Sequence, residues 1–199
     1  MKELVQKQLG QSIATLQATL AEVSIAETLS TVAELTADAM LAGKKLMVAG
    51  NGGSAADAQH LVAEFVVRLV ENRPAMRAIA LTTDTSIMTA GGNDFGFDCI
   101  FARQVEALGQ PGDVFLGIST SGNSMNVLRA LQLAKKIGIT TVGLTGNGGG
   151  KMLSLCDYNL VIPSTVTMNI QESHLALEHI FCLAVEKIYL SRYTQSAQG

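Results

Sequence analysis

The stretch Leu46-Met47-Val48-Ala49-Gly50-Asn51-Gly52-Gly53-Ser54 is the most informative part of this 199-residue sequence. Its four leading apolar residues have the composition of a short strand buried on both faces, and they run directly into a glycine-rich turn. A helical pattern follows. Strand, turn and helix in this order direct free backbone N–H groups and the positive end of a helix at one point, which favours an anion. The stretch predicts an α/β fold with an anion site at this turn; a tight turn without a ligand is the alternative.

Similar short apolar runs recur along the chain, at residues 78–81, 114–118, 141–144 and 160–162. Their continuous rather than alternating apolarity indicates strands buried on both faces. The connections between them are long enough for helices, which implies parallel strands joined by right-handed crossovers. The sequence therefore predicts a three-layer α/β sandwich around a five-stranded parallel sheet.

Helices are expected at both ends of the chain. Ser24 followed by Glu27 has the form of a capping box, so two N-terminal helices fit residues 1–43, the second ending at Gly43. An apolar-periodic stretch at 170–190 predicts a closing helix. No repeat or proline-rich linker divides the chain, so we expect one domain over residues 1–193 and a short tail over 194–199.

Composition excludes several classes of protein. The formal net charge is −3, and no basic, aromatic-interleaved stretch suggests nucleic-acid binding. No apolar run reaches the roughly 18 residues that span a bilayer, and no signal peptide opens the chain, so we expect no membrane partner. The three cysteines are dispersed among apolar residues, as in a reducing compartment. These features predict a cytoplasmic protein.

A second polar loop follows the predicted strand at 114–118. It reads Ser119-Thr120-Ser121-Gly122-Asn123-Ser124 and precedes a helical pattern at 127–137. Its four hydroxyls and the amides of the helix start can donate several hydrogen bonds to a phosphate group. A helix cap is the alternative, although a cap needs one hydroxyl. Both loops leave carboxyl ends of parallel strands, so they converge where open α/β sheets bind ligands.

A nicotinamide-binding site is a competing interpretation of the first loop. Gly50, Gly52 and Ala55 satisfy the spacing of the dinucleotide fingerprint. That fingerprint also needs an acidic residue at the end of the next strand, and Glu71 precedes its strand. The absence of Gly-Lys-Ser/Thr excludes a Walker loop.

Two helices carry polar residues suited to acid–base or metal chemistry. His60 and Glu64 lie at i and i+4, and so share one helix face, although Glu64 also has Arg68 one turn later. The last helix carries Gln171, His174, Glu178 and His179, in which a His174–Glu178 pair is the plain structural interpretation. The set that suits zinc or a similar divalent ion is His60, Glu64, Gln171 and His179. Gln171 and His179 are separated by roughly 12 Å of helix rise, so both side chains would have to extend toward one ion.

Together these residues are similar to a known family over almost the whole chain. The chain resembles the bacterial phosphoheptose isomerases of the sugar isomerase domain superfamily. The motifs that carry the resemblance are 49–54, 57–60, Glu64, 71–74, 92–97, 117–124 and 170–172, with His174 and His179. One position departs from the pattern, because Asn169 stands where relatives commonly have a basic residue.

The resemblance implies a flavodoxin-like sandwich, a homotetramer with sites at subunit contacts, and isomerisation of sedoheptulose 7-phosphate to glycero-manno-heptose 7-phosphate, the first step toward heptose for the cell envelope. It implies Glu64 as the catalytic base and His179 as its acid/base partner. It implies zinc on His60, Glu64, Gln171 and His179. The substrate contacts implied by the resemblance are Asn51, Gly52, Gly53, Ser54, Asn93, Asp94, Ser119, Thr120, Ser121, Ser124 and Gln171.

Aldose–ketose isomerisation through an enediol needs a base over one face of the substrate and an acid at its oxygens. Glu64 and His179 fit these roles, although Glu64 as a zinc ligand keeps only one oxygen as base. A non-catalytic sugar-phosphate-binding protein, such as an adaptor for a replication initiator, needs the loops but not this pair. An isomerase of another sugar phosphate is the nearer alternative. A nicotinamide-dependent dehydrogenase is the third.

Overall fold

The computed structural model describes residues 1–196 and contains a single five-stranded sheet within them. The strands are β1 (Leu46–Gly50), β2 (Ala78–Ala80), β3 (Val114–Ser119), β4 (Thr140–Thr145) and β5 (Tyr158–Val161). All pairs are parallel and the spatial order is β2-β1-β3-β4-β5, the doubly wound order of flavodoxin-like folds. The predicted five parallel strands are confirmed, with ends that differ by one or two residues.

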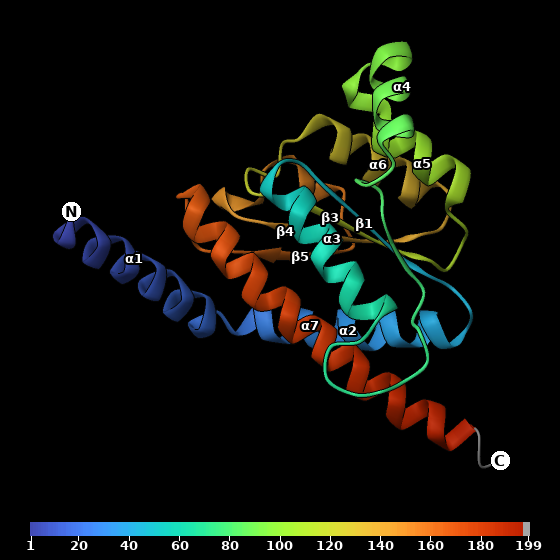
Figure 1. Ribbon diagram of the computed structural model, residues 1–199, viewed down its shortest axis with the longest axis horizontal. Helices are drawn as coiled ribbons and strands as arrows, with labels where there is room; N and C mark the ends of the chain where they lie inside the picture. Colours follow the sequence, from blue (N-terminus) through green and yellow to red (C-terminus); the bar gives the residue numbers. More distant parts are fainter. Residues whose placement is uncertain (197–199) are drawn as a thin grey trace.

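Helices cover both faces of the sheet (Figure 1). They are α1 (Lys2–Ala21), α2 (Val23–Leu41), α3 (Gly53–Val66), α4 (Thr85–Phe95), α5 (Ile100–Leu108), α6 (Met125–Lys136) and α7 (Thr167–Ser196), with short 3-10 segments η1 (Phe97–Cys99) and η2 (Asn147–Ser154). Alternate residues of β1 enter two separate apolar clusters. Leu46 and Val48 pack with α2, α3 and α7, whereas Met47 and Ala49 pack with α5 and α6. The predicted three layers are confirmed.

The N-terminal helices differ from expectation at their junction. The N-cap of α2 is Glu22, with no side-chain cap hydrogen bond, and Ser24 Oγ donates to Glu22 Oε1 at 2.8 Å. The predicted capping box at Ser24 and Glu27 is therefore wrong, because α2 starts one residue before Ser24. The predicted end of α2 is confirmed: Gly43 has φ +76°, and its N–H donates to the Met40 carbonyl.

The closing helix α7 is longer than the predicted 170–190. It begins at Thr167 and continues to Ser196, into the segment expected as a tail, and residues 197–199 lie outside the described part. In Figure 1, α7 runs beside α3 across the molecule, and α1 projects from the body. No helix within residues 1–196 combines the length and apolarity required to cross a bilayer.

Candidate active site

The first loop joins β1 to α3 through Asn51 and Gly52. Gly52 has φ +58° and ψ −120°, a conformation that favours glycine, and it is the N-cap of α3 with no side-chain cap bond. A Cβ atom on Gly50 would lie 2.7 Å from Ser54, so glycine is required for this close return of the chain. The first N–H groups of α3 therefore lie at the loop that follows β1 and have no capping side chain, as an anion site needs.

The second loop joins β3 to α6. Ser124 is the N-cap of α6 but makes no side-chain cap hydrogen bond; its Oγ lies 2.9 Å from Ser119 Oγ instead. Ser121 Oγ accepts from the backbone N–H of Asn123 at 3.2 Å. Capping of α6 thus does not explain the four hydroxyls, and those of Ser119, Ser121 and Ser124 make contacts within the loop itself.

A third loop that sequence analysis missed lies against the second. The run Gly146-Asn147-Gly148-Gly149-Gly150 follows β4, and a Cβ atom on Gly150 would come within 2.5 Å of the Ser121 carbonyl. The N–H of Met152 donates to the Gly122 carbonyl at 3.1 Å. Four glycines in five residues mark a close backbone approach and are the signal that would have found this contact.

The first two loops are joined by a pair of amides. The strand register pairs Gly50 of β1 with Ile118 of β3, so both loops start side by side. Asn51 Nδ2 donates to Asn126 Oδ1 at 2.9 Å, and Asn126 Nδ2 donates to Asn51 Oδ1 at 2.8 Å. Asn126 is 2% exposed. Sequence analysis did not single it out, although a polar residue beside the apolar Val127 and Leu128 was a usable signal.

Three of the predicted acid, base and ligand residues meet between α3 and α7. His60 Nε2 lies 2.9 Å from His179 Nε2 and 3.6 Å from Glu64 Oε1. One ligand atom from each of the three residues lies within 4.8 Å of the others. Within the described residues 1–196, Glu64 forms an ion pair with His60 and none with Arg68, the alternative partner. We call His60, Glu64 and His179 the α3–α7 cluster.

Gln171, the fourth predicted ligand, is placed at the first loop. A Cβ atom on Gly53 would lie 2.5 Å from Gln171 Nε2, so the amide rests on the start of α3. His60 is seven residues further along α3, a rise of roughly 10 Å. Gln171 thus connects α7 to the first loop, at the opposite end of the same helix pair from Glu64.

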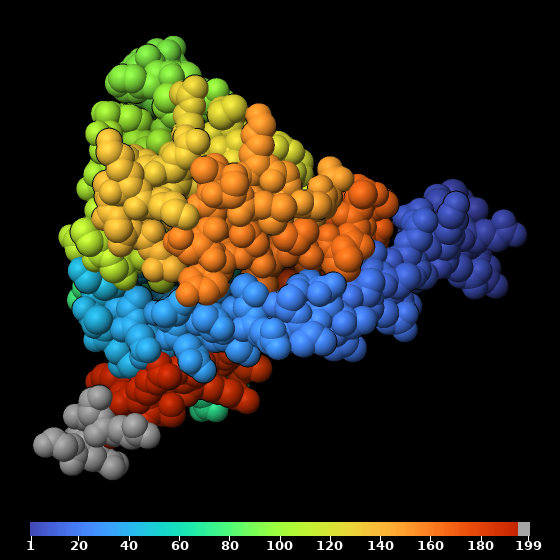
Figure 2. All heavy atoms as spheres, turned by 180° about the vertical axis from the view of Figure 1, so that it is seen from behind, coloured from blue at the N-terminus to red at the C-terminus, as the bar shows by residue number. Residues whose placement is uncertain are grey.

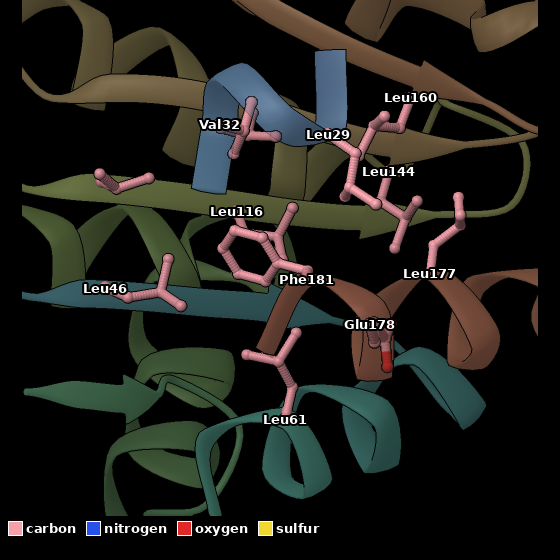
Figure 3. Close-up of a pocket in the computed structure, with 12 residues that line it drawn as sticks. Leu29, Val32, Leu46, Leu61, Leu116, Leu144, Leu160, Leu177, Glu178 and Phe181 are labelled. Atoms are coloured by element: carbon pink, nitrogen blue, oxygen red, sulfur yellow. The ribbon is translucent and has the colours of Figure 1, made fainter. Parts of the chain in front are cut away.

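Helix α7 carries two buried ionisable groups, His174 and Glu178, and Figure 3 shows Glu178 among the apolar side chains of Leu61, Leu177 and Phe181. Glu178 is 2% exposed, and neither carboxylate oxygen has a hydrogen-bond partner; burial, and then the charge of Asp57, raise its pKa to about 8. His174 Nε2 lies 3.1 Å from the Thr145 carbonyl, and burial lowers its pKa to about 4 despite that contact. The expected His174–Glu178 pair is therefore wrong. Glu178 also borders an interior cavity of about 20 Å³ among Leu61, Leu177, Phe181 and other apolar residues, a volume close to that of one water.

Asn93 and Asp94 lie on α4, which projects from the body in Figure 1. Asn93 Nδ2 donates to Asp94 Oδ1 at 2.8 Å, and both residues are exposed. Within a single chain these two predicted substrate residues stand apart from α7 and its cluster. Exposed Phe95 and Phe97 are their neighbours.

Comparison with known proteins identifies the family of the chain. The model of the SIS domain family matches residues 11–146. The chain is 52% identical to a phosphoheptose isomerase of Akkermansia muciniphila over 164 residues, covering 82% of this chain and 87% of the relative. It is 48% identical to the phosphoheptose isomerase of Aneurinibacillus thermoaerophilus, covering 94% of each. The chain belongs to the phosphoheptose isomerase family.

The fold comparison supports the same assignment. The structure of phosphoheptose isomerase GmhA from Neisseria gonorrhoeae superposes with a TM-score of 0.88 at 41% identity, covering 94% of this chain and 98% of that one. Asn169, the position at which the sequence was expected to depart from its relatives, has its polar contacts outside the loops: its Nδ2 donates to Ser12 Oγ at 3.1 Å and to Glu172 Oε2 at 3.2 Å. Asn169 therefore ties the start of α7 to α1.

Proposed function

We propose that this protein is a phosphoheptose isomerase that converts sedoheptulose 7-phosphate to D-glycero-D-manno-heptose 7-phosphate. The observation that carries the proposal is the α3–α7 cluster beside the two joined loops. The loops supply neutral donors for a sugar phosphate, and the cluster supplies a carboxylate and imidazoles for proton transfer. Membership of the family makes an isomerase acting on a sugar phosphate the class of activity.

The reaction moves one proton between C1 and C2 of the sugar and a second between their oxygens. In the ketose-to-aldose direction, Glu64 removes a C1 proton to form a cis-enediol and delivers it to C2. His179 takes the proton from one oxygen and gives it to the other. The second loop, 119–124, grips the phosphate, and the first, 51–54, reads the sugar hydroxyls, so that C1 and C2 lie beneath Glu64 and His179. Holding reacting groups in place in this way can supply a large part of the rate enhancement of an enzyme.

The residues of the cluster also fit a divalent metal ion. Two nitrogens and a carboxylate oxygen are the donors that zinc prefers, and zinc with tetrahedral bonds of about 2.0 Å places two nitrogens roughly 3.3 Å apart. The His60–His179 separation of 2.9 Å is a few tenths of an ångström shorter, which small ring rotations would accommodate. His60, Glu64 and His179 would hold the ion. Gln171, the fourth ligand implied by the resemblance, has its amide on Gly53 and would have to turn away from the first loop to reach the same ion. When bound, zinc would polarise the substrate carbonyl.

Association into a homotetramer belongs to the same proposal. Helix α1 extends beyond the body (Figure 2), and a row of apolar residues on it is exposed to 40% or more. These residues are Leu4, Val5, Leu9, Ile13, Leu16 and Leu20. Apolar rows of this length on a projecting helix favour burial against another subunit. A partner subunit would also bring Asn93 and Asp94 of one chain to the loops of another. We further propose a cytoplasmic location and a role in heptose supply for envelope polysaccharide.

The test is to incubate the purified protein with sedoheptulose 7-phosphate, with and without a chelator, and to follow aldose formation by NMR. Glu64→Gln and His179→Ala are each expected to abolish turnover while sugar-phosphate binding stays measurable by calorimetry. Activity near that of the wild type in either variant contradicts the assigned roles. Binding without conversion under any metal would favour the non-catalytic binding protein.

A further inference from the structure

Arg73 and Glu186 form a buried ion pair at the far end of the contact between α3 and α7. Arg73 Nε donates to Glu186 Oε1 at 2.8 Å, and each side chain is 1% exposed. The second oxygen of Glu186 accepts from the backbone N–H groups of Val70 and Glu71, both at 3.2 Å. Glu186 therefore holds the loop that follows α3 on the surface of α7, and its charge has three donors.

The guanidinium group of Arg73 also caps α3. Its Nη2 donates to the Glu64 carbonyl at 2.7 Å, and its Nη1 donates to the Phe65 carbonyl at 2.9 Å. Both carbonyls belong to the last turn of α3, where no further helical N–H exists to accept from. A positive charge at this end of a helix also interacts favourably with the helix dipole. Arg73 thus contacts the backbone of the residue whose carboxylate is the proposed catalytic base.

The same face of α7 carries Glu186 and His179. They are seven residues apart, which is close to two full turns, so both side chains point toward α3. Between them, Cys182 Sγ lies 3.9 Å from the Leu61 carbonyl. The α3–α7 contact is therefore fixed at Glu186 through Arg73, roughly 10 Å along α7 from the proton-transfer residue His179.

A buried ion pair is weak evidence for a stabilising role, because well-packed apolar residues often replace one without loss. An arginine fork, in contrast, fixes direction as well as distance. This fork ends on the backbone of Glu64, and its counter-ion lies on the helix of His179. The contacts therefore control where the carboxylate of Glu64 lies relative to the imidazole of His179.

We propose that Arg73 and Glu186 are positioning residues, which hold the last turn of α3 so that Glu64 stays in register with His60 and His179. This inference rests on the proposed function for the role of Glu64, but the placement of the cluster is independent of it. We call the Arg73–Glu186 pair the clamp. Loss of the clamp is expected to loosen the α3–α7 cluster without changing the loops that bind substrate.

The chain provides a matched control at the end of the sheet that lies opposite the loops. Asp113 is a buried carboxylate that accepts from Lys45 Nζ at 2.6 Å and from the backbone N–H groups of Lys45 and Gln110. Its set of donors, one cation and two amides, is the same as that of Glu186. It lies at the amino end of β3, before the strands reach the loops. Asp113→Asn therefore measures the loss of such a carboxylate away from the site.

The experiment compares Arg73→Lys, Glu186→Gln and Asp113→Asn with the wild type, at a temperature where circular dichroism shows each to be folded. For the two clamp variants we expect kcat on sedoheptulose 7-phosphate to fall 10- to 100-fold, with KM within threefold of the wild type. Zinc affinity is titrated with the metal alone against a chromophoric chelator. We expect it to fall about tenfold, as is typical when a residue that orients metal ligands is lost. Asp113→Asn should keep kcat within threefold and zinc affinity unchanged, whatever its melting temperature.

Equal losses of kcat in the control and clamp variants, or unchanged zinc affinity in the clamp variants, would overturn the proposal. If the wild type itself does not convert the substrate, the proposed function has failed, and the zinc comparison alone decides the clamp. Arg73→Lys retains the charge but not the fork. Near-normal values for this variant would show that charge alone suffices, and would overturn positioning by the fork.

Discussion

Replacing Gly53 by alanine is a test of the contact between Gln171 and the first loop. The new Cβ atom would lie 2.5 Å from Gln171 Nε2 and 3.2 Å from its Cδ. Ordinary contact needs about 3.5 Å, so the amide must move by roughly 1 Å. Gly53 is the first residue of α3 and is not among the residues with positive φ, so alanine fits its backbone. The direct clash is therefore with one flexible side chain, that of Gln171.

The size of the effect differs between stability and activity. Because the end of a flexible side chain can move away, and alanine favours a helix over glycine by up to about 1 kcal/mol, the free energy of unfolding should change by no more than about 1 kcal/mol. Catalysis is more sensitive, since a misplacement of about 1 Å can lower a rate by roughly 100-fold. We therefore expect kcat/KM for sedoheptulose 7-phosphate to fall by about that factor in a protein of normal stability.

The assay pairs turnover, followed by NMR, with denaturant unfolding. Gly10→Ala on α1 is the control, because a Cβ atom there meets nothing within 4 Å. A double-mutant cycle adds Gln171→Ala, alone and with Gly53→Ala. If displacement of Gln171 is the cause, the double variant is no worse than Gln171→Ala. Activity within twofold of the wild type in Gly53→Ala, or fully additive losses in the cycle, would refute the reasoning.

Three further predictions concern other parts of the molecule. Folding raises the pKa of Glu178 from 4.5 to about 8 and lowers the pKa of His174 from 6.5 to about 4. The two effects on the free energy of unfolding cancel between pH 4.5 and 6.5. From pH 6.5 to 8 only Glu178 contributes, and the free energy of unfolding should fall by up to about 2 kcal/mol. Urea titrations at several pH values measure this fall, which Glu178→Gln should remove. Asn126→Ala leaves the Asn51 amide without its partner, so KM should rise about tenfold or more in steady-state kinetics, and an unchanged KM would contradict a role for the amide pair. Leu9→Glu places a charge on the exposed row of α1 and should give smaller species than the wild type in analytical ultracentrifugation; an unchanged mass would show that this row is not in an interface.

The fold was predictable because the strands and their connections are local patterns. Residues 46–49 and 114–118 are continuous apolar runs, and both became buried strands in the expected parallel order. The error at Ser24 has a local cause as well. The capping box predicts a start from residue types alone, but the chain turns at Glu22, and the Ser24 hydroxyl donates to the Glu22 carboxylate instead of capping a backbone N–H group.

The site was predictable only in part, because its contacts join distant segments. His60 and His179 are 119 positions apart, and neither helix pattern shows that their rings meet. The same reason explains why the amide pair of Asn51 and Asn126 was missed and why the expected His174–Glu178 pair is absent: the deciding contacts come from residues far away in the sequence. Spacing along α7 places His174 and Glu178 on one stripe, but the carbonyl of Thr145 on β4 takes the histidine instead.

The contact between α3 and α7 separates the chemistry from the binding of the ligand. The loops alone would serve a sugar-phosphate sensor equally well, whereas the cluster depends on how these two helices lie against each other. That relation is held at three levels along α3: by Gln171 on Gly53, by His179 beside His60, and by Glu186 through Arg73 on Glu64. Displacing either outer contact should act on the middle one. Gly53→Ala and Glu186→Gln, at opposite ends of α3, should therefore both weaken zinc binding and lower kcat, while Asp113→Asn does neither.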